Sequence, residues 1–223
     1  MARLPLFPLA TVLAPGSTLP LQVFEPRYRQ LVTDLLDGPG APEFGVVAIR
    51  AGSEVGTGAA TRLAEVGCTA VLQHVDSLKP GLYHVKTRGA QRFRVDSILS
   101  DPAPYMVADV TWLPEIDGDT TRIPALARAV RERLEDYCEL IGLPSPAGFD
   151  PVFRRDVDAA RRLSYGVGEH IVLPLDERLQ LLETETTEER LHLARRLLTR
   201  EMKLFDLLQA LPHRIDPSSI TPN

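Results

Sequence analysis

The spacing of the apolar residues changes once along this 223-residue chain, near residue 115, and this change limits the possible folds most strongly. Before that point apolar and polar side chains alternate, as in residues 91–98, where Phe93 and Val95 fall on one face and Arg92 and Arg94 on the other. Alternation is typical of half-buried strands. After residue 115 the apolar side chains recur at helical spacing. The sequence therefore predicts an α+β fold, with the strands first and the helices second.

The first half contains several short alternating runs, a pattern that predicts a barrel or a sandwich. The expected strands are residues 44–49, 66–75, 81–87, 91–98 and 105–113. One helix is expected between strands, from Pro26 to about Leu36. Pro26 suits the first helical position, Glu25 complements the positive end of the helix, and the Gly-Pro-Gly sequence at residues 38–40 ends it.

The second half predicts a series of helices. The first begins at Ile123, where apolar side chains recur along one face and arginines and glutamates fill the other. The second is expected to begin at Asp150 and to end near Gly166, and Asp176 is expected to cap a short third helix.

A capping box marks the start of the longest helix. Thr186 and Glu189 have the required three-residue spacing, and Pro212 is expected to stop the helix. An acidic, turn-rich connector at residues 114–119 separates the two halves. The predicted units are a strand-rich subdomain with one helix at residues 1–116, a helical bundle at 117–212, and a mobile tail at 213–223.

The charge balance disfavours nucleic acid as a partner, because the net charge of -5 offers no broad basic field. No apolar stretch reaches the roughly 20 residues of a membrane helix, so no membrane contact is expected. Pro5 and Pro8 interrupt the apolar start of the chain, which disfavours a signal peptide. The predicted location is the cytoplasm.

Catalytic motifs are missing from the sequence. There is no Gly-Lys dipeptide for a phosphate-binding loop, no G-x-S-x-G elbow and no H-E-x-x-H helix. His74 and His84, with Cys68, permit a speculative cysteine or metal site, but no acid is positioned to orient it. These residues are interpreted as two polar strand positions and a core thiol. The chain is therefore expected to be no enzyme, with no catalytic residue, no metal and no cofactor.

One long motif carries a family resemblance. Residues 4–9 read LPLFPL, residues 12–16 read VLAPG, and residues 19–29 read LPLQVFEPRYR. In this order they resemble the opening of the substrate-binding domain of Lon-type ATP-dependent proteases. Later segments that resemble the same family are residues 44–47, 65–70, 89–95 and 175–183, followed by Arg190-Leu191. The resemblance spans about residues 3–211.

The resemblance implies a PUA-like β-barrel followed by an α-helical bundle. It also implies a non-catalytic role in polypeptide recognition, because the ATPase and peptidase regions of the family's full-length proteases have no counterpart in this sequence. The implied partners are an unfolded or partly folded polypeptide and a protease or chaperone. Two alternatives stay open: an RNA-binding PUA-like module, which the acidic balance disfavours, and an undetected hydrolase.

Aromatic and arginine side chains dominate recognition surfaces, and they give the candidate contacts of the first half. The candidate polypeptide-binding residues are Tyr28, Arg92, Arg94, Tyr105 and Trp112. The motif residues Phe24, Glu25, Pro26, Arg27 and Arg29 are interpreted as structural. Phe24 is expected in the core of a strand, and the charged residues are expected to form ion pairs, with Arg92 or Arg94 as possible partners.

Overall fold

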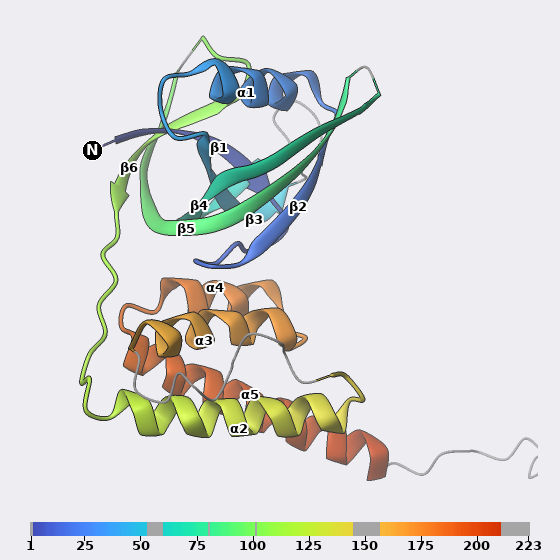
Figure 1. Cartoon of the computed structure of the whole chain (residues 1–223), viewed down its shortest axis with the longest axis vertical. Helices are drawn as coiled ribbons and strands as arrows, with labels where there is room; N and C mark the ends of the chain where they lie inside the picture. Colours follow the sequence, from blue (N-terminus) through green and yellow to red (C-terminus); the bar gives the residue numbers. More distant parts are fainter. Residues whose placement is uncertain (1, 53–59, 80, 101, 145–156, 211–223) are drawn as a thin grey trace, which may run out of the picture.

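The computed structural model describes residues 2–52, 60–79, 81–100, 102–144 and 157–210. A β-sheet with one helix forms one half of the molecule, and a group of helices forms the other (Figure 1). The strands are β1 (Ala2–Leu9), β2 (Thr18–Val23), β3 (Glu43–Gly52), β4 (Ala60–Lys79), β5 (Leu82–Leu99) and β6 (Met106–Trp112). The helices are α1 (Pro26–Asp37), α2 (Ile123–Leu140), α3 (Val157–His170), α4 (Leu175–Glu183) and α5 (Thr187–Ala210). The predicted α+β content and the order of strands before helices are confirmed.

The sheet closes on itself. Its six strands follow the order β2-β5-β4-β3-β1-β6, and β6 pairs with β5 as well as with β1. The pairings between β5, β4, β3, β1 and β6 therefore form a ring, with β2 attached to β5 as an edge strand. Helix α1 covers the end of the sheet that faces away from the helical half (Figure 1).

Strand β5 differs from the sequence prediction, which placed two strands at residues 81–87 and 91–98. One continuous strand runs through Gly89 instead. The turn before β2 crosses β5 there: the Gly89 N–H donates to the Ser17 carbonyl at 2.8 Å, and a Cβ on Gly89 would lie 2.0 Å from the Ala14 carbonyl oxygen. Gly89 therefore marks a close backbone approach and not the end of a strand.

Three helix predictions are confirmed. Helix α1 begins at Pro26 with Glu25 as its N-cap, and α2 begins at Ile123. Helix α5 opens with the expected capping box: the Glu189 N–H donates to Thr186 Oγ1 at 3.1 Å, and the Thr186 hydroxyl donates to Glu189 Oε2 at 3.0 Å. For α1 and α5 the signal is a local steric or hydrogen-bonding preference, and for α2 it is the apolar stripe; the tertiary contacts agree with all three.

Two helix predictions need correction. Helix α3 passes through Gly166 and continues to His170, because the buried Val167 and Ile171 extend its apolar stripe beyond the glycine. Packing of this stripe outweighs the roughly 1 kcal/mol cost of a glycine inside a helix. Asp176 lies in the first turn of α4 and Pro174 is the N-cap. The expected start at Asp150 and the expected tail at residues 213–223 lie outside the described residues.

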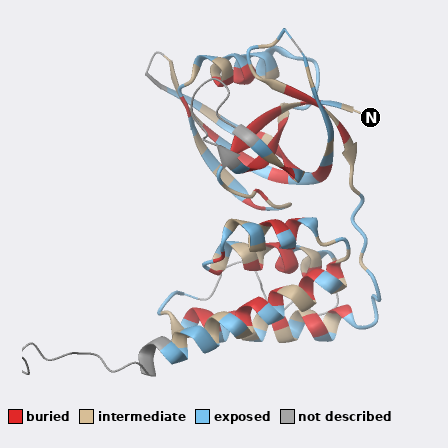
Figure 2. Cartoon of the chain, turned by 180° about the vertical axis from the view of Figure 1, so that it is seen from behind, coloured by how far each residue is buried: buried red, intermediate tan, exposed pale blue. Residues whose placement is uncertain are grey.

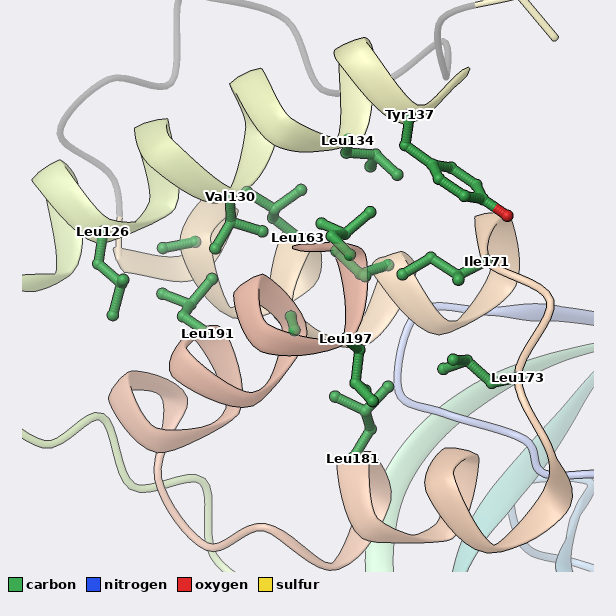
Figure 3. Close-up of a cluster of buried hydrophobic side chains, with 14 of the residues drawn as sticks. Leu126, Val130, Leu134, Tyr137, Leu163, Ile171, Leu173, Leu181, Leu191 and Leu197 are labelled. Carbon is green, nitrogen blue, oxygen red and sulfur yellow. The ribbon is translucent and has the colours of Figure 1, made fainter. Parts of the chain in front are cut away.

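Among the described residues, the buried side chains form one cluster in the helical half and two in the sheet half. Figure 2 shows buried positions on the faces that strands and helices turn toward their neighbours. Helix α4 belongs to both halves: Leu181 packs with Leu197 in the helical cluster (Figure 3), whereas Leu179 and Leu182 belong to the two sheet clusters. The halves therefore share apolar contacts through α4. None of the described helices is long and apolar enough to cross a membrane.

Candidate functional site

The FEPRYR segment, residues 24–29, comprises the link between β2 and α1 and the first turn of α1, and it is called the β2–α1 corner below. Tyr28 stacks on Phe7 with ring centroids 3.8 Å apart and an interplanar angle of 11°. The Arg27 guanidinium lies 4.5 Å from the Tyr28 ring centroid and pairs with Glu25 at 3.0 Å. Arg29 lies against Gly81 in the turn between β4 and β5. Stacking, ion pairing and a neighbouring turn thus fix the backbone of this corner.

Phe24, the first residue of the corner, is 55% exposed. The sequence prediction of a core position for Phe24 is wrong. Leu19, Leu21 and Val23 of β2 point toward the sheet cluster, so strict alternation directs the next residue outward just as the chain turns into α1. The signal was available in the sequence, because residues 19, 21 and 23 already define the inner face.

Tyr28 and Arg92, in contrast to Phe24, are buried. They are 4% and 2% exposed, so neither side chain is accessible to a ligand in this conformation. Tyr28 belongs to the core beneath α1, and Arg92 is buried between the sheet and the helices. The expectation that these two residues form a contact surface is therefore corrected by their burial.

Arg92 forms the centre of a cluster that joins the two halves, here named the junction cluster: Arg92, Glu115, Tyr165 and Arg190. The Arg92 guanidinium donates to Glu115 Oε1 at 3.1 Å. It also donates to four backbone carbonyls, those of Leu182 (2.9 Å), Thr184 (2.8 Å), Pro114 (3.2 Å) and Glu185 (3.3 Å). One side chain from β5 thereby holds both the connector after β6 and the segment between α4 and α5.

Arg190 and Tyr165 complete the junction cluster. The Arg190 guanidinium stacks 3.8 Å from the Tyr165 ring centroid and donates to the carbonyls of Leu181 at 3.0 Å and Thr184 at 2.8 Å. Burial lowers the pKa of Arg190 to about 10, which leaves it charged at neutral pH. Burial raises the pKa of Tyr165, so its hydroxyl stays protonated and donates to Glu115 at 2.9 Å. Three of the four side chains, those of Arg92, Tyr165 and Arg190, are buried and hydrogen-bonded, so the cluster has the geometry of a structural network.

The other three predicted contact residues do not converge on one surface. Arg94 is exposed and lies 3.7 Å from Asp96. Tyr105 is half-buried, and its hydroxyl donates to Asp34 of α1 at 2.7 Å. Trp112 is half-buried and packs edge-on against Phe93, with ring centroids 6.4 Å apart. The predicted set is therefore spread over the sheet, and the expected pairing of the corner residues is local, Arg27 with Glu25.

The residues of the speculative cysteine or metal site are separated by the sheet. Cys68 is fully buried, and burial raises its pKa to about 12, which removes the thiolate at neutral pH. His74 and His84 lie on the outer face of β4 and β5, where His74 contacts Asp76 at 2.9 Å. This arrangement does not support Cys68 as a nucleophile.

A hollow of about 510 Å³ lies on the helical half, beside the start of α5. Its lining residues are Thr184, Glu185, Glu189, His192, Leu193 and Arg196. Thr184 accepts hydrogen bonds from both arginines of the junction cluster, so the wall of this hollow is fixed from behind.

Comparison with known proteins identifies the family. The sequence profile of the ATP-dependent protease La (LON) substrate-binding domain matches residues 3–200. The chain is 26% identical over 214 residues to Lon protease 2 of Syntrophobacter fumaroxidans, which covers 96% of this chain and 26% of that protein. It is 36% identical over 140 residues to Lon protease 2 of Sorangium cellulosum, covering 62% of this chain and 17% of that protein. The chain thus spans about a quarter or less of the length of these proteases.

Two solved structures share the fold. A Lon N-terminal domain protein from Xanthomonas campestris superposes with a TM-score of 0.59 at 24% identity, covering 95% of this chain and 100% of that one. The N-terminal domain of the Mycobacterium avium complex Lon protease superposes with a TM-score of 0.65 at 18% identity, covering 89% and 98%. The profile match over nearly the whole chain is decisive: the chain belongs to the Lon substrate-binding domain family.

Proposed function

We propose that this chain is a non-catalytic polypeptide-recognition module that binds unfolded or partly folded proteins at the β2–α1 corner. The family membership supports the class of ligand. The observation that carries the location is the 55% exposure of Phe24, an aromatic residue inside the motif on which the resemblance rests. Aromatic side chains are frequent recognition hot spots because they bury much apolar area with little loss of conformational freedom.

The corner is suited to this role because it is rigid around an exposed ring. Tyr28, Arg27 and Arg29 are each fixed by a stacking partner, an ion pair or a turn, so binding need not order this backbone. Unfolded proteins expose apolar side chains that folded proteins bury. Burial of a phenylalanine against such a side chain contributes about 1.5–3 kcal/mol.

The wider proposal keeps the units inferred from the sequence. It comprises a PUA-like β-barrel at residues 1–116, which the ring of strand pairings supports, and a helical bundle at residues 117–212. A protease or chaperone that receives the bound polypeptide would be a second partner. The two buried, free cysteines agree with a cytoplasmic location.

A pair of equally exposed apolar residues tests the site. Phe24 and Leu36 are both 55% exposed, but only Phe24 lies at the corner. Fluorescence anisotropy with labelled, unfolded casein should show that Phe24→Ala weakens binding by about thirtyfold, the effect of losing a hot-spot side chain. Leu36→Ala should change the affinity by less than about twofold. Both variants should keep the thermal midpoint of the parent, because neither residue is buried.

Equal binding by both variants and the parent would show that the client surface lies elsewhere. The hollow beside α5 would then be the next surface to test, with Arg196→Ala. A structured RNA serves as a competing ligand in the same assay. Tighter binding of RNA than of casein, unaffected by Phe24→Ala, would contradict the proposed function and favour the RNA-binding alternative.

A further inference from the structure

Strand β2 is an edge strand of the sheet. It pairs with β5 on one side, and no described strand pairs with its other side, along the outside of the molecule (Figure 1). A free edge presents unpaired backbone N–H and C=O groups, which can pair with an extended segment of another chain. This edge leads directly into Phe24 at the β2–α1 corner.

The pairing register shows which residues of β2 direct their backbone N–H and C=O groups toward the free side of the strand. Thr18 pairs with Arg88 and Leu19 with Thr87. The Gly89 N–H donates to the Ser17 carbonyl at 2.8 Å, and the Thr87 hydroxyl donates to the Leu19 carbonyl at 2.9 Å, so residues 17 and 19 direct their carbonyls toward β5. In an antiparallel ladder this orientation alternates. The backbone groups of the even-numbered residues therefore point to the free side.

Pro20 fits this assignment. A proline has no N–H, and within a sheet it is tolerated where that group would face away from the neighbouring strand. The free side of β2 consequently offers N–H donors at Thr18 and Gln22 and carbonyl acceptors at Thr18, Pro20 and Gln22. An added strand could therefore donate to a carbonyl at all three outward positions and accept from an N–H at all of them except the central one, Pro20.

The side chains of β2 define two different faces for an added strand. Leu19 and Leu21 are half-buried and pack against the sheet cluster, so they extend an apolar surface toward the free edge. Thr18, Pro20 and Gln22 are exposed on the outer face and carry no charge. A strand beside β2 would therefore alternate between an apolar and a polar environment.

The outer face next to this edge is basic. Lys86 and Arg88 of β5 are exposed and lie opposite Pro20 and Thr18 in the register. On their other side they face His74 and Val71 of β4. These two cations stand on a chain whose net charge is -5. Because Pro20 and Thr18 are short, the long side chains of Lys86 and Arg88 can extend over them toward an added strand.

We propose that the free edge of β2 accepts an extended segment of the bound polypeptide as an added strand whose residues alternate between apolar and acidic. The apolar side chains lie beside Leu19 and Leu21, and the acidic ones lie beside Thr18 and Pro20, within reach of Lys86 and Arg88. This inference rests on the proposed function, because it specifies the class of polypeptide that the module recognises.

Two backbone substitutions test the added strand without changing the inner face of β2. The probe is a labelled peptide of alternating valine and glutamate, compared with a peptide of the same composition in two blocks. Gln22→Pro removes an outward N–H and should weaken binding of the alternating peptide about fivefold, whereas Pro20→Thr adds one and should strengthen it by a similar factor. The block peptide should bind weakly to all three proteins. Thermal midpoints check that the variants are folded.

Charge reversal tests the acidic preference. The double variant Lys86→Glu, Arg88→Glu should lose affinity for the valine–glutamate peptide and should prefer a valine–lysine peptide, a reversal that general destabilisation cannot produce. Equal binding of the alternating and block peptides would overturn the proposal, as would unchanged binding by folded Pro20→Thr.

The casein assay separates this inference from the proposed function. If Phe24→Ala weakens casein binding while the β2 variants bind all peptides alike, the polypeptide-recognition role stands and the added strand is wrong. If neither casein nor any peptide binds, both fail.

Discussion

The sheet half and the helical half bury their residues by different means. In the sheet, Gly67 and Gly45 allow the Phe93 ring to fill the interior: a Cβ on either glycine would lie within 2.6 Å of Phe93 Cζ. In the helical half, one cluster of mostly aliphatic side chains forms at ordinary helical spacing, with Val130 and Leu134 of α2 fully buried (Figure 3). The sheet therefore depends on particular residues at particular positions, whereas the helices depend on a repeating pattern.

This difference bears on where the proposed recognition features lie. The β2–α1 corner is fixed by contacts within the sheet half, where Tyr28 stacks on Phe7 of β1, so Phe24 is presented by a rigid support. The helical half contributes through α4 and the junction cluster, where Arg92 from the sheet holds carbonyls that end α4 and precede α5. The helical half therefore supports the sheet through α4, with charged contacts at two places in the described part of the chain: the junction cluster, and the ion pairs of Arg50 in β3 with Asp176 and Glu183 of α4.

The largest expected effect comes from breaking the junction cluster at Arg92. Arg92→Ala removes one hydrogen bond from Glu115 and one from each of four backbone carbonyls of the junction, and should lower the free energy of unfolding by about 3 kcal/mol or more. Urea denaturation measures the loss. Arg94→Ala is the matched control, two residues further along β5, where the side chain is exposed and the Asp96 contact is 3.7 Å long. Its expected cost is below about 0.5 kcal/mol.

Similar stability of the two arginine variants would mean that the halves adhere mainly through the leucines of α4. The junction cluster would then contribute little to holding the halves together, and the proposed role of Arg92 would be wrong.

An identical substitution in each half gives the next largest contrast. Gly67→Ala places a Cβ 2.5 Å from Phe93 Cζ and 2.5 Å from the Val46 carbonyl oxygen, so the backbone must shift, at a cost of about 1–3 kcal/mol. Gly168→Ala in α3 meets only the end of the Leu181 side chain, at 3.3 Å, and alanine favours a helix over glycine by about 1 kcal/mol. Its net effect should lie within about 1 kcal/mol of zero.

Thermal or urea unfolding of both glycine variants checks this contrast. Equal destabilisation by the two substitutions would refute the idea that the sheet depends on exact positions more than the helices do.

Local signals in the sequence predicted the fold well where the local preference and the tertiary contacts agree. The capping box at Thr186 and Glu189 and the proline at the start of α1 are such cases. Prediction failed where a distant contact decided the outcome. Gly89 looked like a strand end because the approach of Ala14 from another part of the chain cannot be seen in a local pattern. Helix α3 gives a second example, because the packing of its apolar stripe carries the helix past Gly166, where the sequence predicted its end.

The candidate site was predicted less well, for a related reason. Tyr28 and Arg92 have the chemistry of recognition residues, but stacking on Phe7 and hydrogen bonds to the segment before α5 bury them. Residue type predicts what a side chain can do and leaves open which surface will cover it. Phe24 could have been recognised from the alternation of β2, whereas the burial of Arg92 required knowledge of where α4 packs.

The smallest expected effect concerns the surface of the helical half, where Glu177 of α4 accepts hydrogen bonds from Arg200 of α5. The hydrogen bond from Arg200 lowers the pKa of Glu177, so the contribution of this pair to stability is present above the pKa of the unfolded chain, about 4.3. It is lost as the pH falls through the lower folded pKa. Arg200 is 43% exposed and also binds Glu201, so the contribution should be only a few tenths of a kcal/mol. Glu177→Gln should therefore differ slightly from the parent in urea unfolding at pH 7, and this difference should shrink as the pH falls through the folded pKa of Glu177, with the exposed Glu139→Gln on α2 as the charge control. A difference above about 1 kcal/mol at pH 7 would mean that surface ion pairs, and not the aliphatic cluster alone, hold the helical half together.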